Sequence, residues 1–417
     1  MLVVGLGFGG LAAPTAAGAR PAVWTPQPSL SAPDAAVGDS FGAGVVISVS
    51  GTTAFVSAPE KEIDGHDMAG AVDVFVRDGD GWTFQAELTA NDGARLDFFG
   101  ASVSTTKDGS TVVIGAPFKT VSGKRNAGAA YVFVRTGTTW KQRVELTGAP
   151  SGRGNQFGAE VAINGVAGVI AVGAPRRSVA GFHRAGAVYV FKRNGQTYPQ
   201  YQLLTEPSPG AAHSFGWALA VKESQVIVSS PFRVNDNGST GVVYGFENPT
   251  GPYELKSTLT AADGQPGDDF GWDVSESVAT MVISARYHAS AHGVGAVYVF
   301  THSDRTDVWT ARPPILPPDG SSTDDFGEVV SISNGTVAIG DPLHDIGESS
   351  DQGATYVYAG AAAHWTLRAE LTASDAHAFT NFGQSVAAFP DTVMVGERDH
   401  DANGVTDAGI VDVFARS

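Results

Sequence analysis

Basic and aromatic residues gather in several stretches near the middle of the chain, between residues 117 and 292. Arginine offers forked hydrogen-bond donors to carboxylate and sulfate groups, and aromatic rings offer apolar platforms for sugar rings. This combination favours binding of an anionic partner, either an acidic or sulfated glycan or an acidic protein surface. The candidate ligand-binding residues are Lys124, Arg125, Arg176, Arg177, Phe182, His183, Arg184, Arg233, Arg286, Tyr287 and His288.

A second candidate site is a carboxylate-rich stretch near the C-terminus. Asp399, Asp401, Asn403, Gly404 and Asp407 form the pattern DxDxNGxxD. Oxygen atoms at this spacing around a turn glycine suit Ca²⁺, although the bidentate glutamate that usually ends such a loop is missing. The alternative is a polar surface turn, because Asn-Gly and Asp are common turn residues. Asp399, Asp401, Asn403 and Asp407 are therefore candidate ligands for Ca²⁺, and no cofactor is required.

An enzymatic role is the main alternative to binding. Arg286, Tyr287 and His288, with His183 and His292, are the residue types that a polysaccharide lyase uses as a cation, an acid and a base. In an extended chain, however, successive side chains point to opposite sides, so three consecutive residues do not form one such site. The sequence also contains no HExxH metal-protease motif. We therefore predict a non-catalytic protein.

Composition excludes several classes of function. The chain of 417 residues has a net charge of −17 and no cysteine. Such an acidic chain does not neutralise phosphates, so nucleic acid is excluded as a general partner. Without cysteine there are no disulfides, thiolate nucleophiles or cysteine-ligated zinc.

The first 19 residues carry no charge, and the small residues at positions 17–19 precede Arg20. This predicts a signal peptide over residues 1–19 and a secreted or cell-surface protein, although no basic residue precedes the apolar stretch. An N-terminal membrane anchor is the alternative, and no other membrane segment is expected.

Three linked motifs recur seven times along the rest of the chain. The first is a Phe-Gly pair at intervals of 55 to 58 residues, the second is a corner resembling Gly-Ala-Pro, and the third is a glycine five residues before an aromatic residue. An aspartate two residues before the phenylalanine recurs in four repeats and is predicted to cap a turn. The repeats start near residues 39, 97, 155, 213, 268, 324 and 380.

Each repeat has the pattern of four short strands. Residues 186–191 alternate with period two, residues 111–115 are a continuous apolar stretch typical of a buried strand, and residues 82–88 form an outer strand. Four strands in each of seven repeats predict an all-β, seven-bladed β-propeller over residues 20–417, as one domain. The seventh repeat ends after its third strand, and residues 24–30 copy the pattern of residues 82–88. The N-terminal strand is therefore predicted to complete the last blade.

These motifs resemble the FG-GAP repeat family, the propeller of integrin α-subunit heads and of many secreted microbial proteins. The resemblance implies recognition of a protein or glycan, often in adhesion, and implies that each Phe packs between blades. Integrin-type repeats often carry the calcium loop DxDxDGxxD between the Phe-Gly pair and the corner. Here the corresponding connections, such as residues 48–53 and 331–336, contain too few carboxylates. The usual metal sites of the family are predicted to be missing.

Charge is segregated among the loops between the second and third strands, which should all open onto one face. The loops of repeats two to five are basic, whereas those of repeats six, seven and one are acidic. The acidic residues are Asp345, Glu348, Asp351, Asp399, Asp401, Asp407, Glu60, Glu62, Asp64 and Asp67. A face with a basic arc and an acidic arc could also bind another copy of the chain. A structural subunit of an extracellular assembly is therefore a further alternative.

Overall fold

The computed structural model describes residues 23–416, apart from residues 80, 165–167, 224, 235–237, 239, 249–250, 291, 304–307, 319, 322–323, 348, 374–378 and 403. The predicted signal peptide therefore lies outside the described residues. The described residues form 28 strands and no helix. Accordingly, this part of the chain has no helix with the length and apolar character needed to cross a membrane.

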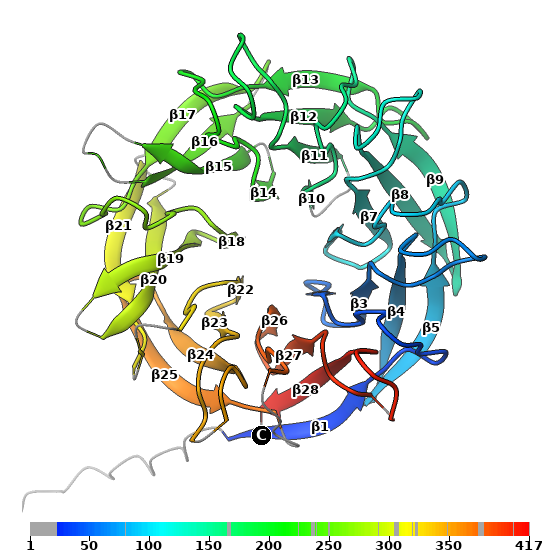
Figure 1. Cartoon of the computed structure of the whole chain (residues 1–417). Coiled ribbons are helices and arrows are strands. Elements are labelled where there is room, and N and C mark those ends of the chain that lie inside the picture. The colour runs from blue at the N-terminus through cyan, green and yellow to red at the C-terminus, as the bar shows by residue number, and fades with distance from the viewer. Residues whose placement is uncertain are drawn as a thin grey trace, which may run out of the picture.

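The strands form seven four-stranded antiparallel sheets arranged around a central opening (Figure 1). In blades one to six, each sheet takes four consecutive strands, with the first innermost and the fourth outermost. Blades one and two are β2 (Gly44–Ile47), β3 (Thr53–Ala58), β4 (Ala71–Asp78) and β5 (Gly81–Leu88), then β6 (Ser102–Thr105), β7 (Thr111–Ala116), β8 (Ala129–Thr136) and β9 (Thr139–Leu146). Blades three and four are β10 (Val161–Ile163), β11 (Val169–Ala174), β12 (Ala187–Lys192) and β13 (Gln200–Leu204), then β14 (Leu219–Lys222), β15 (Gln225–Val234), β16 (Thr240–Glu247) and β17 (Glu254–Leu259).

The remaining three blades follow the same order. Blades five and six are β18 (Val274–Ser277), β19 (Thr280–Ser290), β20 (Gly293–Ser303) and β21 (Val308–Ile315), then β22 (Val330–Ser333), β23 (Thr336–Asp341), β24 (Ala354–Ala361) and β25 (His364–Leu371). Blade seven is β26 (Ser385–Phe389), β27 (Thr392–Glu397), β28 (Ile410–Arg416) and β1 (Trp24–Leu30). The predicted seven-bladed propeller is confirmed.

The two ends of the described chain meet in blade seven. Strand β1 pairs antiparallel with β28, so that Trp24 lies opposite Arg416 and Pro26 lies opposite Phe414. Figure 1 shows this pair as the blue and red strands side by side. The predicted closure by the N-terminal strand is confirmed, and it removes the free edge that β28 would otherwise present.

Burial along the strands explains their sequence patterns. Every residue of β7 is buried because this strand lies inside a sheet that is covered on both faces by neighbouring blades. The outer strand β9 instead alternates between exposed and partly buried residues up to a buried Leu146. A continuous apolar stretch therefore marks a central strand, and alternation marks an outer one.

The repeated phenylalanines and glycines form the contact between blades. Phe99 is fully buried between blades one and two and packs edge-on against Phe133 at 5.9 Å. Gly128 has a left-handed backbone, with φ +85°, and a Cβ there would lie 2.0 Å from the carbonyl oxygen of Phe157 in the next blade. The third sequence motif therefore marks a close approach between backbones, which only glycine permits.

The innermost strands line a cavity of about 280 Å³ around the ring axis. Serine side chains tie these strands together across blades. Ser104 Oγ accepts a hydrogen bond of 3.2 Å from the Ile163 amide, and Ser331 Oγ accepts one of 3.0 Å from the Ala388 amide. These bonds satisfy amides at the edge of each inner strand, which have no partner strand.

Candidate functional site

The loops between the second and third strands of the blades form one face of the ring, which we call the loop face. Each such loop bonds to the connection that enters the next blade. In blade two, Asn126 and Ala127 accept backbone hydrogen bonds of 3.1 and 3.0 Å from the amides of Gln156 and Phe157. Neighbouring loops are thereby held in a fixed order around the ring, and side chains from adjacent blades can act on one ligand.

The tips of these loops are small hairpins. In blade two, Val121 pairs with Lys124 across Ser122 and Gly123, which both have positive φ. Two successive residues of positive φ are the signature of a tight type I′ turn. In blade three, the equivalent hairpin has Phe182 at its end, with 45% of its surface exposed. The turns therefore hold these side chains out towards solvent.

Blades two and three present a group of exposed cations on the loop face, which we call the basic sector. It consists of Lys124, Arg125, Arg153, Arg176 and Arg184. Lys124 Nζ donates to the Ser151 carbonyl at 2.7 Å, whereas the four arginine side chains form no ion pair with the described residues. Exposed His183 lies beside them, with Nδ1 3.4 Å from Ser178 Oγ. Sequence reasoning missed Arg153 because it lies in the connection entering blade three, outside the loops considered.

Three of the predicted binding residues instead interact with the connection that enters their own blade. Arg177 donates to the Pro150 carbonyl at 2.9 Å, Arg233 pairs with buried Glu206 at 3.3 Å, and His288 Nδ1 lies 2.7 Å from Asp268. They belong to a basic position that recurs in every blade. Its members are Lys61, Lys119, Arg177, Arg233, His288, His344 and His400.

This recurring position stabilises the loops. Lys119 is buried and pairs with Asp92 at 3.0 Å and with Asp97 at 3.2 Å. Burial by itself would lower the pKa of Lys119, but hydrogen bonds and charge from these two aspartates raise it above its usual value. In the sequence, this position is the basic residue three places after the residue that corresponds to the alanine of the Gly-Ala-Pro corner. Arg177, Arg233 and His288 were predicted to bind a ligand because their partners in the preceding connection are not evident from the sequence.

Arg286 and Tyr287 belong to an aromatic cluster between blades four and five. The Arg286 guanidinium lies 3.4 Å from the centroid of the Trp272 ring and 4.4 Å from that of Tyr287, and it donates to Glu328 at 2.7 Å. Trp217 packs against Trp272 at 4.8 Å. The two tryptophans follow their Phe-Gly pairs directly, where blades one to three have alanine, and this signal was also missed.

The aspartates before the Phe-Gly pairs are turn caps, as predicted. Asp97 Oδ2 accepts a 3.0 Å hydrogen bond from the Ala94 amide, and Asp268 Oδ2 accepts one of 2.7 Å from the Gln265 amide. The next residue has a left-handed backbone in several blades, including Ser40 with φ 55° and Phe98 with φ 54°. Ser40 stands in a Gly-x-Ser-x-Gly pattern, but the shared conformation makes it part of the repeated turn.

The candidate calcium residues lie in the loop of blade seven. Asn403 falls outside the described residues. Asp401 Oδ1 accepts a 3.1 Å hydrogen bond from the Asp407 amide, and Asp399 Oδ2 accepts one of 2.9 Å from Asn381 Nδ2. In blade six, Asp345 caps its loop in the same way without the full calcium pattern. Turn capping thus accounts for Asp401, and a side-chain hydrogen bond from the connection entering the blade accounts for Asp399. Calcium binding stays a prediction.

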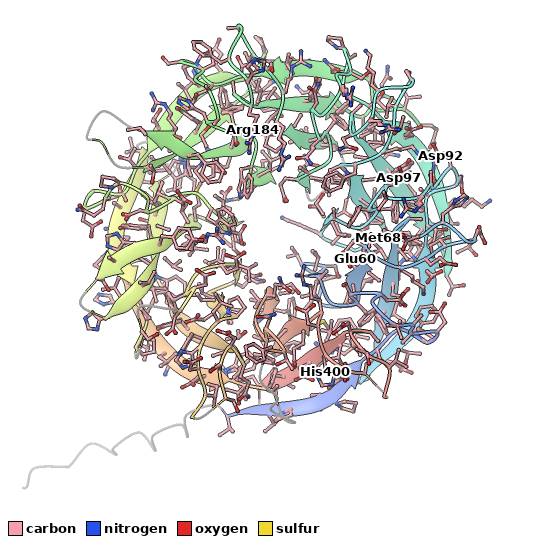
Figure 2. The ribbon with its side chains drawn as sticks, in the orientation of Figure 1. Glu60, Met68, Asp92, Asp97, Arg184 and His400 are labelled. Carbon is pink, nitrogen blue, oxygen red and sulfur yellow. The ribbon has the colours of Figure 1, made fainter. Side chains whose placement is uncertain are left out.

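Glu348 lies outside the described residues. The other acidic residues of blades six, seven and one form the opposite part of the loop face, as the closed ring requires. Figure 2 labels Arg184 on one side of the ring and His400, in the loop of blade seven, on the other. Among these acids, Asp67 is paired with Arg95 at 3.1 Å, while Glu60 and Glu62 form no ion pair with described residues.

Comparison with known sequence families agrees with this architecture. The FG-GAP repeat profile matches residues 24–75, 82–133, 140–191, 253–300, 309–358 and 365–414, which is most of the chain. The chain belongs to the FG-GAP repeat family. Each matched segment starts on the outer strand of one blade, or one residue before it, and ends on the third strand of the next, as the first does from β1 to β4. No curated protein matches the chain. FG-GAP propellers commonly serve as extracellular recognition and adhesion modules.

Proposed function

We propose that this chain is a secreted, non-catalytic recognition module that binds an anionic glycan through its basic sector. The observation that carries the proposal is the group of exposed cations on two adjacent loops and one connection of a chain whose net charge is −17. Exposed cations are ordinarily interspersed with acids, and here four arginines gather without an acidic partner among the residues that the structure describes.

The side chains of the basic sector suit sulfate or carboxylate groups spaced along a polysaccharide. Each guanidinium can donate two parallel hydrogen bonds to one such group. Exposed Phe182, on the same loop as Arg176 and Arg184, can support the apolar face of a sugar ring. The acidic residues on the far side of the face would repel the same polymer and so restrict it to blades two and three. Since these cations are exposed, binding should weaken as salt increases.

Retention on a column of sulfated polysaccharide tests the proposal. Replacing Arg125, Arg176 and Arg184 by serine should abolish retention at a salt concentration at which the unchanged protein is retained. A matched control replaces Lys141, Arg143 and Arg368, which are exposed on the outer strands of blades two and six, by serine. This variant has the same change in net charge, but away from the loop face. Equal losses in the two variants, or no loss in the first, would contradict the proposal.

Two further partners remain to be separated by experiment. An acidic protein surface would use the same arginines, and would compete with the polysaccharide for the column-binding site. Self-association would instead pair the basic sector of one copy with the acidic loops of another. Light scattering that rises with protein concentration and falls with salt, and that the arginine variant abolishes, would favour assembly over glycan recognition.

A further inference from the structure

Blade six contains a buried group of three potential metal ligands that lies apart from the basic sector. Asp324 comes from the connection entering the blade, Asp341 ends β23, and His344 lies in the loop that follows. One ligand atom from each side chain lies within 4.8 Å of the others. Their exposed fractions are 2%, 0% and 8%.

Blade five has the same aspartate–histidine pair as blade six but lacks the third ligand, Asp341. Both blades hold an aspartate–histidine pair, since His344 Nδ1 lies 3.1 Å from Asp324 Oδ2 and His288 Nδ1 lies 2.7 Å from Asp268 Oδ2. In blade five the corner residue is Ala285, whereas in blade six it is Asp341. The turn needs the pair but not a third carboxylate, so Asp341 requires a separate explanation.

The carboxylate of Asp341 is only half satisfied. Its Oδ1 accepts a 2.9 Å hydrogen bond from the Asp325 amide. Its Oδ2 has no hydrogen-bond partner among the described residues, although Asp341 is fully buried. A buried carboxylate oxygen without a partner is costly, and either a proton or a cation would remove that cost. The neighbouring carboxylate and imidazole make this position suitable for a cation.

We propose that Asp324, Asp341 and His344 bind a divalent transition-metal ion, with Zn²⁺ as the best match. Two carboxylates and one imidazole are ligands that zinc accepts, with bonds of about 2.0–2.2 Å. Tetrahedral zinc would separate its ligand atoms by roughly 3.3–3.6 Å, so the 3.1 Å between Asp324 Oδ2 and His344 Nδ1 needs only a small adjustment. Water would take the fourth position.

The surroundings hold the ligands in place. Both oxygens of Asp324 accept hydrogen bonds of 2.8 Å from Ser321, one from its amide and one from its hydroxyl. The ring of Tyr356 packs edge-on against the His344 imidazole at 6.0 Å. Such contacts fix the orientation of metal ligands. A bound ion would link three segments of blade six: the connection that enters the blade, its corner and the loop that follows. It would therefore stabilise this part of the fold.

Zinc uptake by the untagged full-length protein tests this site. After treatment with a chelator and titration with Zn²⁺ alone, we expect about one zinc ion per chain by elemental analysis and a rise in melting temperature. The variant Asp341→Ala reproduces the corner of blade five and should retain no zinc. The control Glu62→Ala removes an exposed carboxylate beside the equivalent basic residue of blade one, and should bind zinc as the unchanged protein does.

Two results would overturn the proposal. One is the absence of stoichiometric zinc uptake by the unchanged protein, and the other is equal uptake by Asp341→Ala. Should the alanine variant fail to fold, Asp341→Asn keeps the shape of the side chain and removes its charge. Its zinc affinity should then fall at least about tenfold. An asparagine variant with unchanged affinity would show that Asp341 merely holds a proton.

Discussion

The close approach of blades at the repeated glycines gives a sharp prediction for Gly128→Ala. Gly128 has φ +85°, and an added Cβ would lie 2.0 Å from the carbonyl oxygen and 2.6 Å from the amide nitrogen of Phe157. Gly123 lies in the same loop with φ +76°, yet an added Cβ there would meet nothing within 4 Å. The two substitutions therefore share the backbone strain and differ in the contact between blades.

The expected magnitudes follow from this difference. A left-handed backbone costs a non-glycine residue roughly 1–2 kcal/mol, which is the whole effect expected for Gly123→Ala. Overpacking typically adds about 1–3 kcal/mol, so Gly128→Ala should lose about 2–5 kcal/mol of unfolding free energy. With an unfolding entropy of roughly 2.1 cal/mol/K per residue, the melting temperature should fall by about 2–6 °C for Gly128→Ala and about 1–2 °C for Gly123→Ala.

Calorimetry on the two variants under identical conditions measures both shifts. A larger loss in Gly128→Ala than in Gly123→Ala supports the account of the repeated glycine as a site of contact between blades. Equal shifts would refute it, because the added methyl group would then cost nothing beyond the backbone conformation.

Three further substitutions test other parts of the ring. Burial raises the pKa of Asp73 from 3.8 to about 7, so between these pH values the folded state keeps a proton that the unfolded state has lost. The free energy of unfolding should therefore fall as the pH rises from 3.8 to 7. In urea unfolding, Asp73→Asn should be more stable than the unchanged protein at pH 8 and similar to it at pH 3.5. Lys119→Met should cost about 3–5 kcal/mol because it leaves buried Asp97 without its counter-ion, and an unchanged melting temperature would contradict this. Trp24→Ala should cost about 3–5 kcal/mol by removing a side chain buried in blade seven, and should promote association through the loosened edge of β28, measured by light scattering.

The sequence was sufficient to predict the architecture because the same three motifs recur in every repeat. Phe99 and Gly128 recur at fixed places since every blade must make the same contact with the next. The outer strand of blade seven was predictable because Trp24–Leu30 repeats the pattern of the other outer strands. These features depend on local pattern and repetition, which a single sequence displays.

The candidate site was less predictable because charge in a sequence does not reveal pairing. Arg176 and Arg177 are adjacent, yet Arg176 is exposed while Arg177 donates to the Pro150 carbonyl in the connection that enters its blade. Arg233 has the same appearance in the sequence as the exposed arginines, but its partner Glu206 comes from a different connection. Which cations remain for a ligand depends on contacts between loops that are distant in sequence.

Binding to an array of glycans, with and without a calcium chelator, tests the central claim most directly. The account predicts binding to acidic or sulfated glycans that weakens with salt and is lost when Arg125, Arg176 and Arg184 are replaced by serine. If the chelator also abolished binding, the loop at Asp399 would contribute to the site as a calcium loop. Absence of any glycan bound under either condition, or binding that survives the loss of the three arginines, would contradict the account.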